Sequence, residues 1–201
     1  MKKLSALAMM MMVAASASWA QVNNGEPAPE FTLTDTKGAA HNLSDFRGKY
    51  VVLEWVNHGC PFVVKFYSVG KMQELQKAAT ADGVVWLSIC SSAEGKQGHM
   101  APDAWNAKIE ESGSAPTAVL LDAEGTVGKQ YGAKTTPHMY VIDPEGILIY
   151  QGAIDSIRST DSDDIPNAEN YVMAALAQHK AGEEIKNPNT PAYGCSVKYK
   201  D

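Results

Sequence analysis

An apolar strand, a tight turn, a cysteine and a proline follow one another in this chain, and this succession constrains the fold more than any other feature. Residues 51–56 are mostly apolar, as in a strand that is buried on both faces of a sheet. Residues 57–59 form a polar turn, and Cys60 then precedes Pro61, which suits the first turn of a helix because it lacks an N–H. Free backbone N–H groups and the helix dipole favour a thiolate there. We predict that Cys60 is the reactive residue; the alternative is a buried structural cysteine.

The first 20 residues have the composition of a secretory signal peptide. Two lysines follow Met1, an apolar stretch runs to position 17, and Ser18-Trp19-Ala20 matches a small-x-small cleavage site. An uncleaved membrane anchor would need about 20 apolar residues, more than this segment offers. We therefore expect an exported protein without a membrane anchor after cleavage, in which residues 21–201 form one domain ending in a tail at 187–201.

The charge and the cysteine count narrow the classes of function. Two of the 17 basic residues and none of the 23 acidic residues lie in the predicted signal peptide, which leaves 15 against 23 and a net charge of −8. Such an acidic surface argues against nucleic acid as a partner. The three cysteines fit no zinc-binding spacing and are an odd number, so at least one thiol stays free or pairs transiently in an oxidising compartment. We expect a redox role, with no metal and no cofactor.

The hydrophobic pattern predicts an α/β fold with a central mixed sheet, helices on both faces and an N-terminal β-hairpin. Apolar residues spaced by three and four predict one helix over residues 61–81, ended by Asp82-Gly83. The strand at 84–90 should run parallel to the strand at 51–56, so that both carboxyl ends open on the same edge. The other expected elements are a hairpin at 31–34 and 41–43, helices at 102–111 and 167–181, a weak helical turn within 122–132, and strands at 117–121, 138–142 and 147–151.

Several motifs in this order resemble the thioredoxin superfamily, in particular redoxin domains of the alkyl-hydroperoxide-reductase and thiol-specific-antioxidant type. The opening Ala-Pro-Glu-Phe-Thr-Leu at 28–33, followed by Leu-Ser-Asp-Phe-Arg-Gly-Lys at 43–49, is typical of redoxin domains. Thr-Thr-Pro at 135–137 is similar to the cis-proline loop of thioredoxins. The ending at 190–199 resembles the tail of a peroxiredoxin-like branch with an Asn-x-x-Cys-Pro-Phe-Val segment, here at 57–63. The resemblance covers residues 25–200 and implies a thioredoxin-like fold.

The chain departs from both families at positions that matter for chemistry. Thioredoxins have a second cysteine three residues after the first, where this chain has Val63. Peroxiredoxins have a proline and a threonine or serine where this chain has Leu53 and Asn57. The two arginines, Arg47 and Arg158, do not lie where peroxiredoxins place theirs. The groups that orient a peroxide and stabilise its transition state are therefore missing.

The resemblance also assigns Glu54, an acid within the apolar strand, to proton transfer at a thiol at or near Cys60. Burial should raise the pKa of this carboxyl; the alternative is an acid that faces solvent or pairs with a lysine. His58, if protonated, would lower the pKa of Cys60, whereas an exposed loop histidine would have no such role.

The remaining candidates support the site. Asn57 is expected to cap the turn or to bind the backbone of a partner. Lys65 is expected to have a solvated side chain. The resemblance implies that Pro137 is cis and that the backbone of Thr136 is presented to an extended partner segment beside Cys60.

A second cysteine must complete the reaction, because Cys60 has no neighbouring thiol. Cys195 is the preferred resolving thiol, since it lies in a flexible tail that could fold back over the site. Cys90 is the alternative, although it is more simply a buried residue at a strand end. A structural disulfide between Cys90 and Cys195 is the third arrangement.

The sequence therefore predicts an exported thiol–disulfide oxidoreductase that uses Cys60, with a protein or small-molecule disulfide as its partner and an external thiol as its electron donor. The first alternative is a peroxiredoxin-type peroxidase that reduces hydroperoxides with the same thiol. The second is a redoxin-fold binding module in which Cys60 is incidental.

Overall fold

The computed structural model describes residues 22–201, so the predicted signal peptide at residues 1–20 lies outside the described residues. The chain forms nine strands and five α-helices over this range, with two 3-10 helices, η1 and η2. In order, the elements are β1 (Thr32–Asp35), β2 (Ala40–Asn42), η1 (Leu43–Phe46), β3 (Val51–Trp55), α1 (Pro61–Tyr67), α2 (Lys71–Ala81), β4 (Val85–Cys90), α3 (Pro102–Ser112), β5 (Ala118–Leu121), α4 (Thr126–Gln130), β6 (Thr135–Thr136), β7 (His138–Ile142), β8 (Leu148–Gly152), η2 (Ser162–Asn167), α5 (Tyr171–Lys180) and β9 (Cys195–Ser196).

The predicted central mixed sheet is confirmed. Seven strands lie in the order β2-β1-β5-β4-β3-β7-β8. Strands β3, β4 and β5 are parallel, whereas β7 is antiparallel to β3 and β1 is antiparallel to β5. The predicted hairpin forms from β1 and β2. Since β3 and β4 are parallel and in register, the residues that follow them, including Cys60, lie at the same edge of the sheet.

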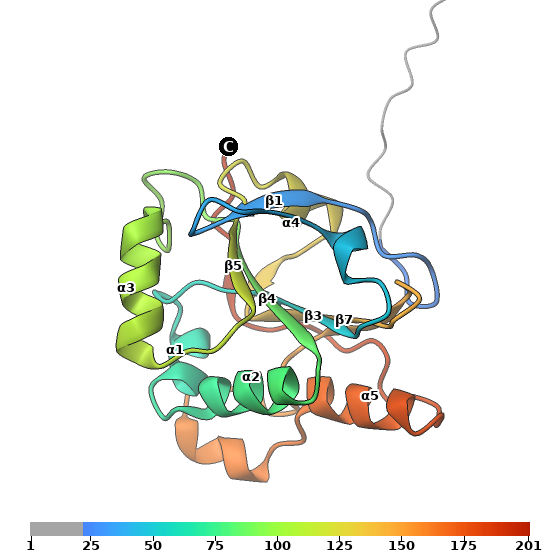
Figure 1. Ribbon diagram of the computed structural model, residues 1–201. Coiled ribbons are helices and arrows are strands. Elements are labelled where there is room, and N and C mark those ends of the chain that lie inside the picture. The colour runs from blue at the N-terminus through green and yellow to red at the C-terminus, as the bar shows by residue number, and fades with distance from the viewer. Residues whose placement is uncertain (1–21) are drawn as a thin grey trace, which may run out of the picture.

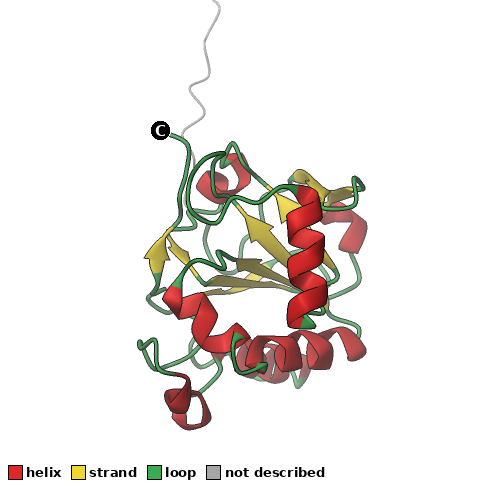
Figure 2. Ribbon diagram, turned by 90° about the vertical axis from the view of Figure 1, so that its left-hand side faces the viewer, coloured by secondary structure: helices red, strands yellow, loops and turns green. Residues whose placement is uncertain are grey.

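Each face of the sheet has its own hydrophobic core. Helices α2 and α5 lie along one face, while η1 and α4 pack on the other (Figure 1). Helix α3 stands in front of the strands in the view turned by 90° (Figure 2). Its Trp105 belongs to a third, smaller cluster at the ends of β3 and β4, which also contains Cys60 and Cys90. The edge of the sheet that carries Cys60 is therefore lined by apolar residues.

The single helix predicted over residues 61–81 is wrong. The structure has two helices, α1 and α2, separated at residues 68–70. Gly70 adopts a left-handed conformation with φ of 77°, which glycine accepts without the steric cost that a Cβ brings. The apolar spacing continues across the break because both helices pack against the same core.

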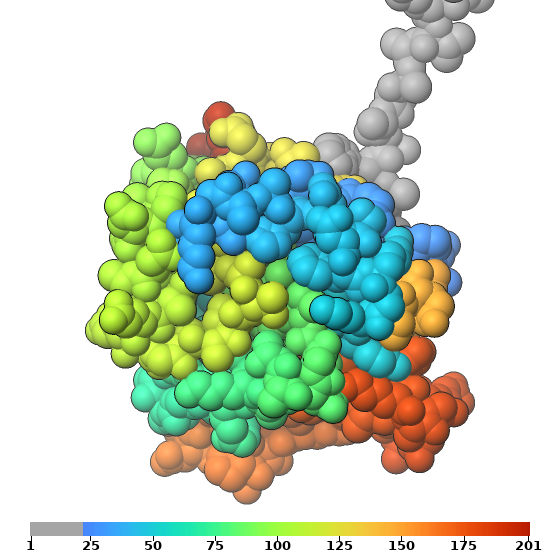
Figure 3. All heavy atoms as spheres, in the orientation of Figure 1, coloured from blue at the N-terminus to red at the C-terminus, as the bar shows by residue number. Residues whose placement is uncertain are grey.

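The C-terminal tail lies on the body of the protein over most of its length. Strand β9 pairs with β6, so that Cys195 is opposite Thr136. Further backbone bonds join the tail to three other segments, with Gln151 N–H donating to Pro188 O, Val197 N–H to Lys134 O and Ala93 N–H to Lys198 O. In the space-filling view the dark red C-terminal residues lie beside the yellow region of α4, where the Tyr199 hydroxyl donates to Ala133 O (Figure 3). The predicted folding back of the tail over the site is thus what the structure contains.

Candidate active site

Cys60 is the N-cap residue of α1, directly before Pro61, as the sequence predicts. Its backbone N–H donates to Asn57 O at 2.9 Å, and its carbonyl accepts from the N–H groups of Val63 and Val64, both at 2.9 Å. These bonds close the turn and start the helix. The Cys60 side chain is fully buried, with 0% exposure. A partner can therefore reach this sulfur only after a neighbouring segment moves.

Asn57 fixes the turn that carries Cys60. Its Oδ1 accepts from Gly59 N–H at 2.8 Å, and its Nδ2 donates to Gln97 O at 3.2 Å. The Gln97 side chain donates in return to Gly59 O at 2.9 Å. Gly98 allows this approach, because a Cβ there would lie 2.4 Å from the Asn57 side chain. Gln97 carries no local sequence signal for this role, since it lies in a polar loop 40 residues from the turn.

The Thr136–Pro137 peptide bond is cis, as predicted, and the loop contacts Cys60 directly. The Cys60 thiol donates to Thr136 O at 3.0 Å. The Thr136 hydroxyl is buried and forms no hydrogen bond of ordinary length with any described residue. Backbone pairing of β6 with β9 places Cys195 on the same loop. The edge that the sequence assigned to an extended partner segment is therefore occupied by the chain's own tail.

The thiols of Cys60 and Cys195 interact, and their acidities shift in opposite directions. Burial raises the pKa of Cys60, but hydrogen bonds from the side chain and backbone of Cys195, from the Thr136 side chain and from Val63 N–H together bring it below the ordinary value. The pKa of Cys195 rises to about 11, through burial first and then through the hydrogen bond and charge of Cys60. Of this pair, Cys60 is the thiol that ionises first.

Cys90 lies where the prediction of a buried strand end places it. It is 3% exposed and packs in the same cluster as Cys60. Its thiol donates to Gly98 O at 3.4 Å, and burial raises its pKa. All three cysteines are free thiols in the structure, so the Cys90–Cys195 disulfide considered from sequence is not formed here.

Glu54 is buried in the middle of the sheet and receives four hydrogen bonds from neutral groups. The donors are Trp86 Nε1 at 2.8 Å, Ser88 Oγ at 2.9 Å, the Tyr67 hydroxyl at 2.9 Å and Gln76 Nε2 at 3.3 Å. Burial raises the pKa of the Glu54 carboxyl, and these bonds oppose the rise without cancelling it. Neither solvent nor a lysine neutralises this acid. Tyr67 also packs against the cluster that holds Cys60.

His58 is half-buried between aromatic rings and is uncharged at neutral pH. Its ring lies 4.6 Å from that of Tyr67 and 5.2 Å from that of Trp105, measured between centroids. Burial, together with the charge of Lys108, lowers the pKa of His58 to about 4. The hypothesis of a protonated His58 that acidifies Cys60 is therefore wrong near pH 7, because the ring carries no charge there.

The expectation of a solvated Lys65 is also wrong. The Lys65 side chain is 0% exposed, and its ammonium lies 3.4 Å from Asp155 Oδ2 while donating to Ile157 O at 3.2 Å. The Tyr193 hydroxyl donates to the other oxygen of Asp155. Sequence reasoning missed Asp155 and Tyr193. The available signal was a lysine among Val64, Phe66 and other apolar residues of a short helix.

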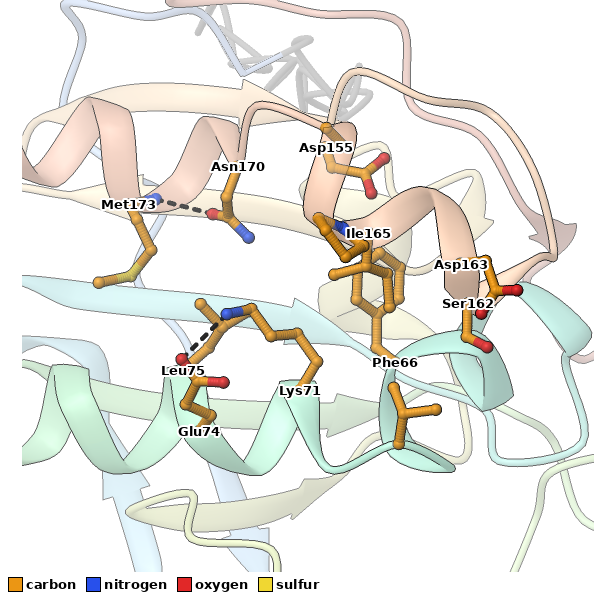
Figure 4. A pocket seen from close by; sticks show the side chains of 13 residues that line it. Phe66, Lys71, Glu74, Leu75, Asp155, Ser162, Asp163, Ile165, Asn170 and Met173 are labelled. Atoms are coloured by element: carbon orange, nitrogen blue, oxygen red, sulfur yellow. Dashed lines mark hydrogen bonds and ion pairs between the residues drawn. The ribbon is translucent and has the colours of Figure 1, made fainter.

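A separate cavity of about 850 Å³ lies between α1, α2, η2 and α5, and Asp155 forms part of its wall. Figure 4 looks into this cavity, with Lys71 and Glu74 of α2 on one side and, on the other, Met173 of α5 and Asn170, the N-cap residue of that helix. Cys60 and Cys195 are not among its lining residues. The cavity therefore shares Asp155 with the Lys65–Asp155–Tyr193 contacts, but the thiols do not line it.

Across residues 22–201, no helix combines the length and apolar character that crossing a bilayer requires. Over the same range, no three His, Cys, Asp or Glu side chains lie together in an arrangement suited to a metal ion.

Comparison with known proteins agrees with this architecture. A thiol-disulfide oxidoreductase ResA of Geobacillus kaustophilus is 33% identical over 129 residues, a match that spans 61% of this chain and 64% of the relative. The structure of an uncharacterized conserved protein from Geobacillus kaustophilus superposes with a TM-score of 0.76 at 26% identity, covering 90% of this chain and 94% of the other. A thiol:disulfide interchange protein from Bacteroides sp. superposes with a TM-score of 0.52 at 26% identity, covering 73% and 87%. The family model described as the AhpC/TSA family matches residues 24–151. This chain, with its thioredoxin-like fold, belongs to the AhpC/TSA family.

Proposed function

We propose that the protein is an exported thiol–disulfide oxidoreductase in which Cys60 attacks a partner disulfide and Cys195 resolves the product. The observation that carries this proposal is that Cys195 lies opposite Thr136, whose carbonyl accepts the Cys60 thiol. In this arrangement the pKa of Cys60 is lowered and that of Cys195 is raised. A lowered pKa increases the thiolate fraction of Cys60, and the thiolate is the nucleophile. The raised pKa keeps Cys195 protonated while Cys60 is free. The two cysteines thus have separate roles before any partner binds.

The reaction follows from this asymmetry. The Cys60 thiolate forms a bond to one sulfur of the partner disulfide, and the other sulfur leaves as a thiolate. Once Cys60 is in the mixed disulfide, its charge no longer raises the pKa of Cys195. Cys195 then loses its proton and attacks the Cys60 sulfur, releasing the second partner thiolate. In sum, two protein thiols are oxidised to a disulfide, the partner disulfide is reduced, and two protons pass to its sulfurs.

Glu54 is the proposed proton carrier for the thiols. A buried carboxyl with a raised pKa and no cation beside it holds a proton more readily than an exposed carboxyl, as a group that donates and accepts a proton must. Tyr67 donates to this carboxyl and also packs against the cluster around Cys60, so it lies between the two groups. Asn57 and Pro61 hold the Cys60 turn, and Thr136 and Pro137 hold the opposite side of the site.

The partner is proposed to be a disulfide of a protein or of a small molecule, with an external thiol reducing the Cys60–Cys195 bond afterwards. The similarity to proteins named thiol-disulfide oxidoreductase and thiol:disulfide interchange protein supports this substrate class. The signal-like composition of residues 1–20 supports export. An oxidising compartment is where disulfide partners persist.

A peroxidase that uses the same thiol fits the site less well. Leu53 and Asn57 replace the proline and hydroxyl residue that peroxiredoxins place before the cysteine. Arg47 is committed elsewhere, since its guanidinium contacts Glu30 and Glu145 O. Steady-state consumption of hydrogen peroxide in the presence of a thiol donor measures this activity directly, and we expect it to be slow compared with disulfide exchange.

Turnover of oxidised glutathione by single-cysteine variants tests the proposal. We expect Cys60→Ser to lose the reaction and Cys195→Ser to stop with one glutathione on Cys60, as seen by non-reducing mass spectrometry. Cys90→Ser is the matched control, because it removes a thiol of the same cluster and should leave turnover in place. A Cys60→Ser protein that exchanges disulfides at the wild-type rate would overturn the assignment.

A further inference from the structure

Three buried polar groups from distant parts of the chain meet where the tail packs against α1. Lys65 comes from α1, Asp155 follows β8, and Tyr193 precedes β9. The Lys65–Asp155 pair is almost free of solvent, at 0% and 3% side-chain exposure, and Tyr193 is 5% exposed. Replacing a buried ion pair by apolar groups is often neutral or stabilising, so such a pair is weak evidence of a purely stabilising role. We therefore look to the position of the Lys65–Asp155 pair in the fold for its role.

That position links the two cysteines of the site. Lys65 lies in the helix that Cys60 caps, and Tyr193 is two residues before Cys195. The Tyr193 ring also packs edge to face on Phe62, with centroids 5.7 Å apart. The Lys65–Asp155–Tyr193 network therefore ties the element that carries the attacking thiol to the segment that carries the resolving thiol.

Gly194, between Tyr193 and Cys195, lies very close to the Thr136 backbone. Gly194 has φ of 142°, and a Cβ there would lie 2.1 Å from Thr136 O. This carbonyl is also the acceptor of the Cys60 thiol. The backbone of the tail thus passes directly over the loop that contacts Cys60, in a register that a side chain at position 194 would not allow.

We propose that Tyr193, acting through Asp155 and Lys65, is a positioning residue that holds Cys195 in place for attack on the Cys60 mixed disulfide. This inference rests on the function proposed above. The network raises the effective concentration of the Cys195 thiol at the Cys60 sulfur, so intramolecular closure outruns competition by external thiols. The same contacts keep the tail over Cys60, so breaking them exposes the Cys60 sulfur to partners.

Reaction with dithiobis(nitrobenzoate) separates these two steps. Attack by Cys60 releases one nitrothiobenzoate in a bimolecular phase, and attack by Cys195 on the adduct releases the second in a first-order phase. We expect Tyr193→Phe to slow the second phase about tenfold, a factor near the lower end for the loss of one hydrogen bond to a charged group. The first phase should become faster. Tyr199→Phe is the matched control, because it removes another tail hydroxyl, the one bound to Ala133 O, and should change neither phase.

Two further variants distinguish positioning from general damage to the fold. Asp155→Asn retains an acceptor for the Tyr193 hydroxyl, so it should preserve the second phase better than Tyr193→Phe does. Gly194→Ala should slow the second phase by displacing Cys195 without touching the network. An unchanged second-phase rate in Tyr193→Phe would overturn the inference, whatever the effect of Gly194→Ala. Failure of the proposed function has a different signature, since Cys195→Ser would then still release the second equivalent.

Discussion

Two of the buried carboxylates in this protein, Glu54 and Asp155, are stabilised in different ways. Glu54, at 0% exposure, is surrounded by four uncharged donors from β4, α1 and α2. Asp155, at 3% exposure, faces the ammonium of Lys65 and the hydroxyl of Tyr193. Burial raises the pKa of Glu54, and hydrogen bonds from neutral groups do not cancel this rise. The acid without a cation is suited to exchanging a proton, whereas the acid with a cation is suited to holding segments together.

The largest effect is expected when the cation beside Asp155 is removed. Lys65→Met fills the same space but leaves the Asp155 carboxylate buried without its partner. Loss of one member of a buried pair costs about 3–5 kcal/mol, and we expect the free energy of unfolding in urea to fall by that amount. Lys71→Met is the control, because Lys71 pairs with Glu74 at the surface and such pairs contribute under about 1 kcal/mol. A similar small loss in both variants would show that Asp155 does not depend on Lys65.

The second variant, Glu54→Gln, tests whether ionisation of Glu54 destabilises the folded protein. A carboxyl whose folded-state pKa lies above its unfolded value binds more protons when folded, so stability falls as the pH rises through the interval between the two values. Each unit of difference corresponds to about 1.4 kcal/mol. Glu54→Gln keeps the size of the side chain and removes this titration. We therefore expect the variant to gain stability relative to wild type as the pH rises above 4.5, the ordinary value for the carboxyl.

Urea unfolding of both proteins at several pH values measures this difference. Glu54→Gln should also slow glutathione turnover, since general acid–base catalysis by one group typically contributes about 100-fold or more. A stability difference that is constant with pH would mean that Glu54 does not titrate in the folded protein. Turnover at the wild-type rate would remove it from proton transfer.

Local sequence rules predicted one of these two acids and not the other. Glu54 stands out because it interrupts an apolar strand, and the turn, Pro61 and the Thr-Pro loop are likewise readable from a few neighbouring residues. The Lys65 side chain was wrongly predicted to be solvated, because its partner Asp155 lies 90 residues further along the chain. Tyr193 and Gln97 were missed for the same reason, since their roles arise only when the tail and the loop pack against the site. The break at Gly70 was hidden by apolar spacing that continues through it.

A smaller effect is expected at Thr136, which contacts Cys60 but neither carboxylate. Its hydroxyl helps to lower the pKa of Cys60, and it is otherwise unpartnered among residues 22–201. Thr136→Val retains the branched shape and removes the donor, so the Cys60 pKa should rise by about one unit, the equivalent of one hydrogen bond. Thiolate absorbance as a function of pH measures this shift, with Thr135→Val as the neighbouring control. An unchanged pKa would assign the acidity of Cys60 to Cys195 and the helix start alone.

The smallest effect on Cys60 is expected at His58, although it is only two residues away. The ring is uncharged above its pKa of about 4, so His58→Gln should leave the thiol pKa of Cys60 unchanged at neutral pH. The substitution should be visible in stability instead. Because the folded-state pKa lies below the ordinary 6.5, His58 destabilises the fold as the pH falls from about 6.5 to about 4, and the variant should lose less stability over that interval. His138 has a similarly lowered pKa and should retain its share of the acid sensitivity. A rise in the Cys60 pKa in His58→Gln would instead show a charged imidazole beside the thiol, and the turn, rather than Thr136 and Cys195, would then set its reactivity.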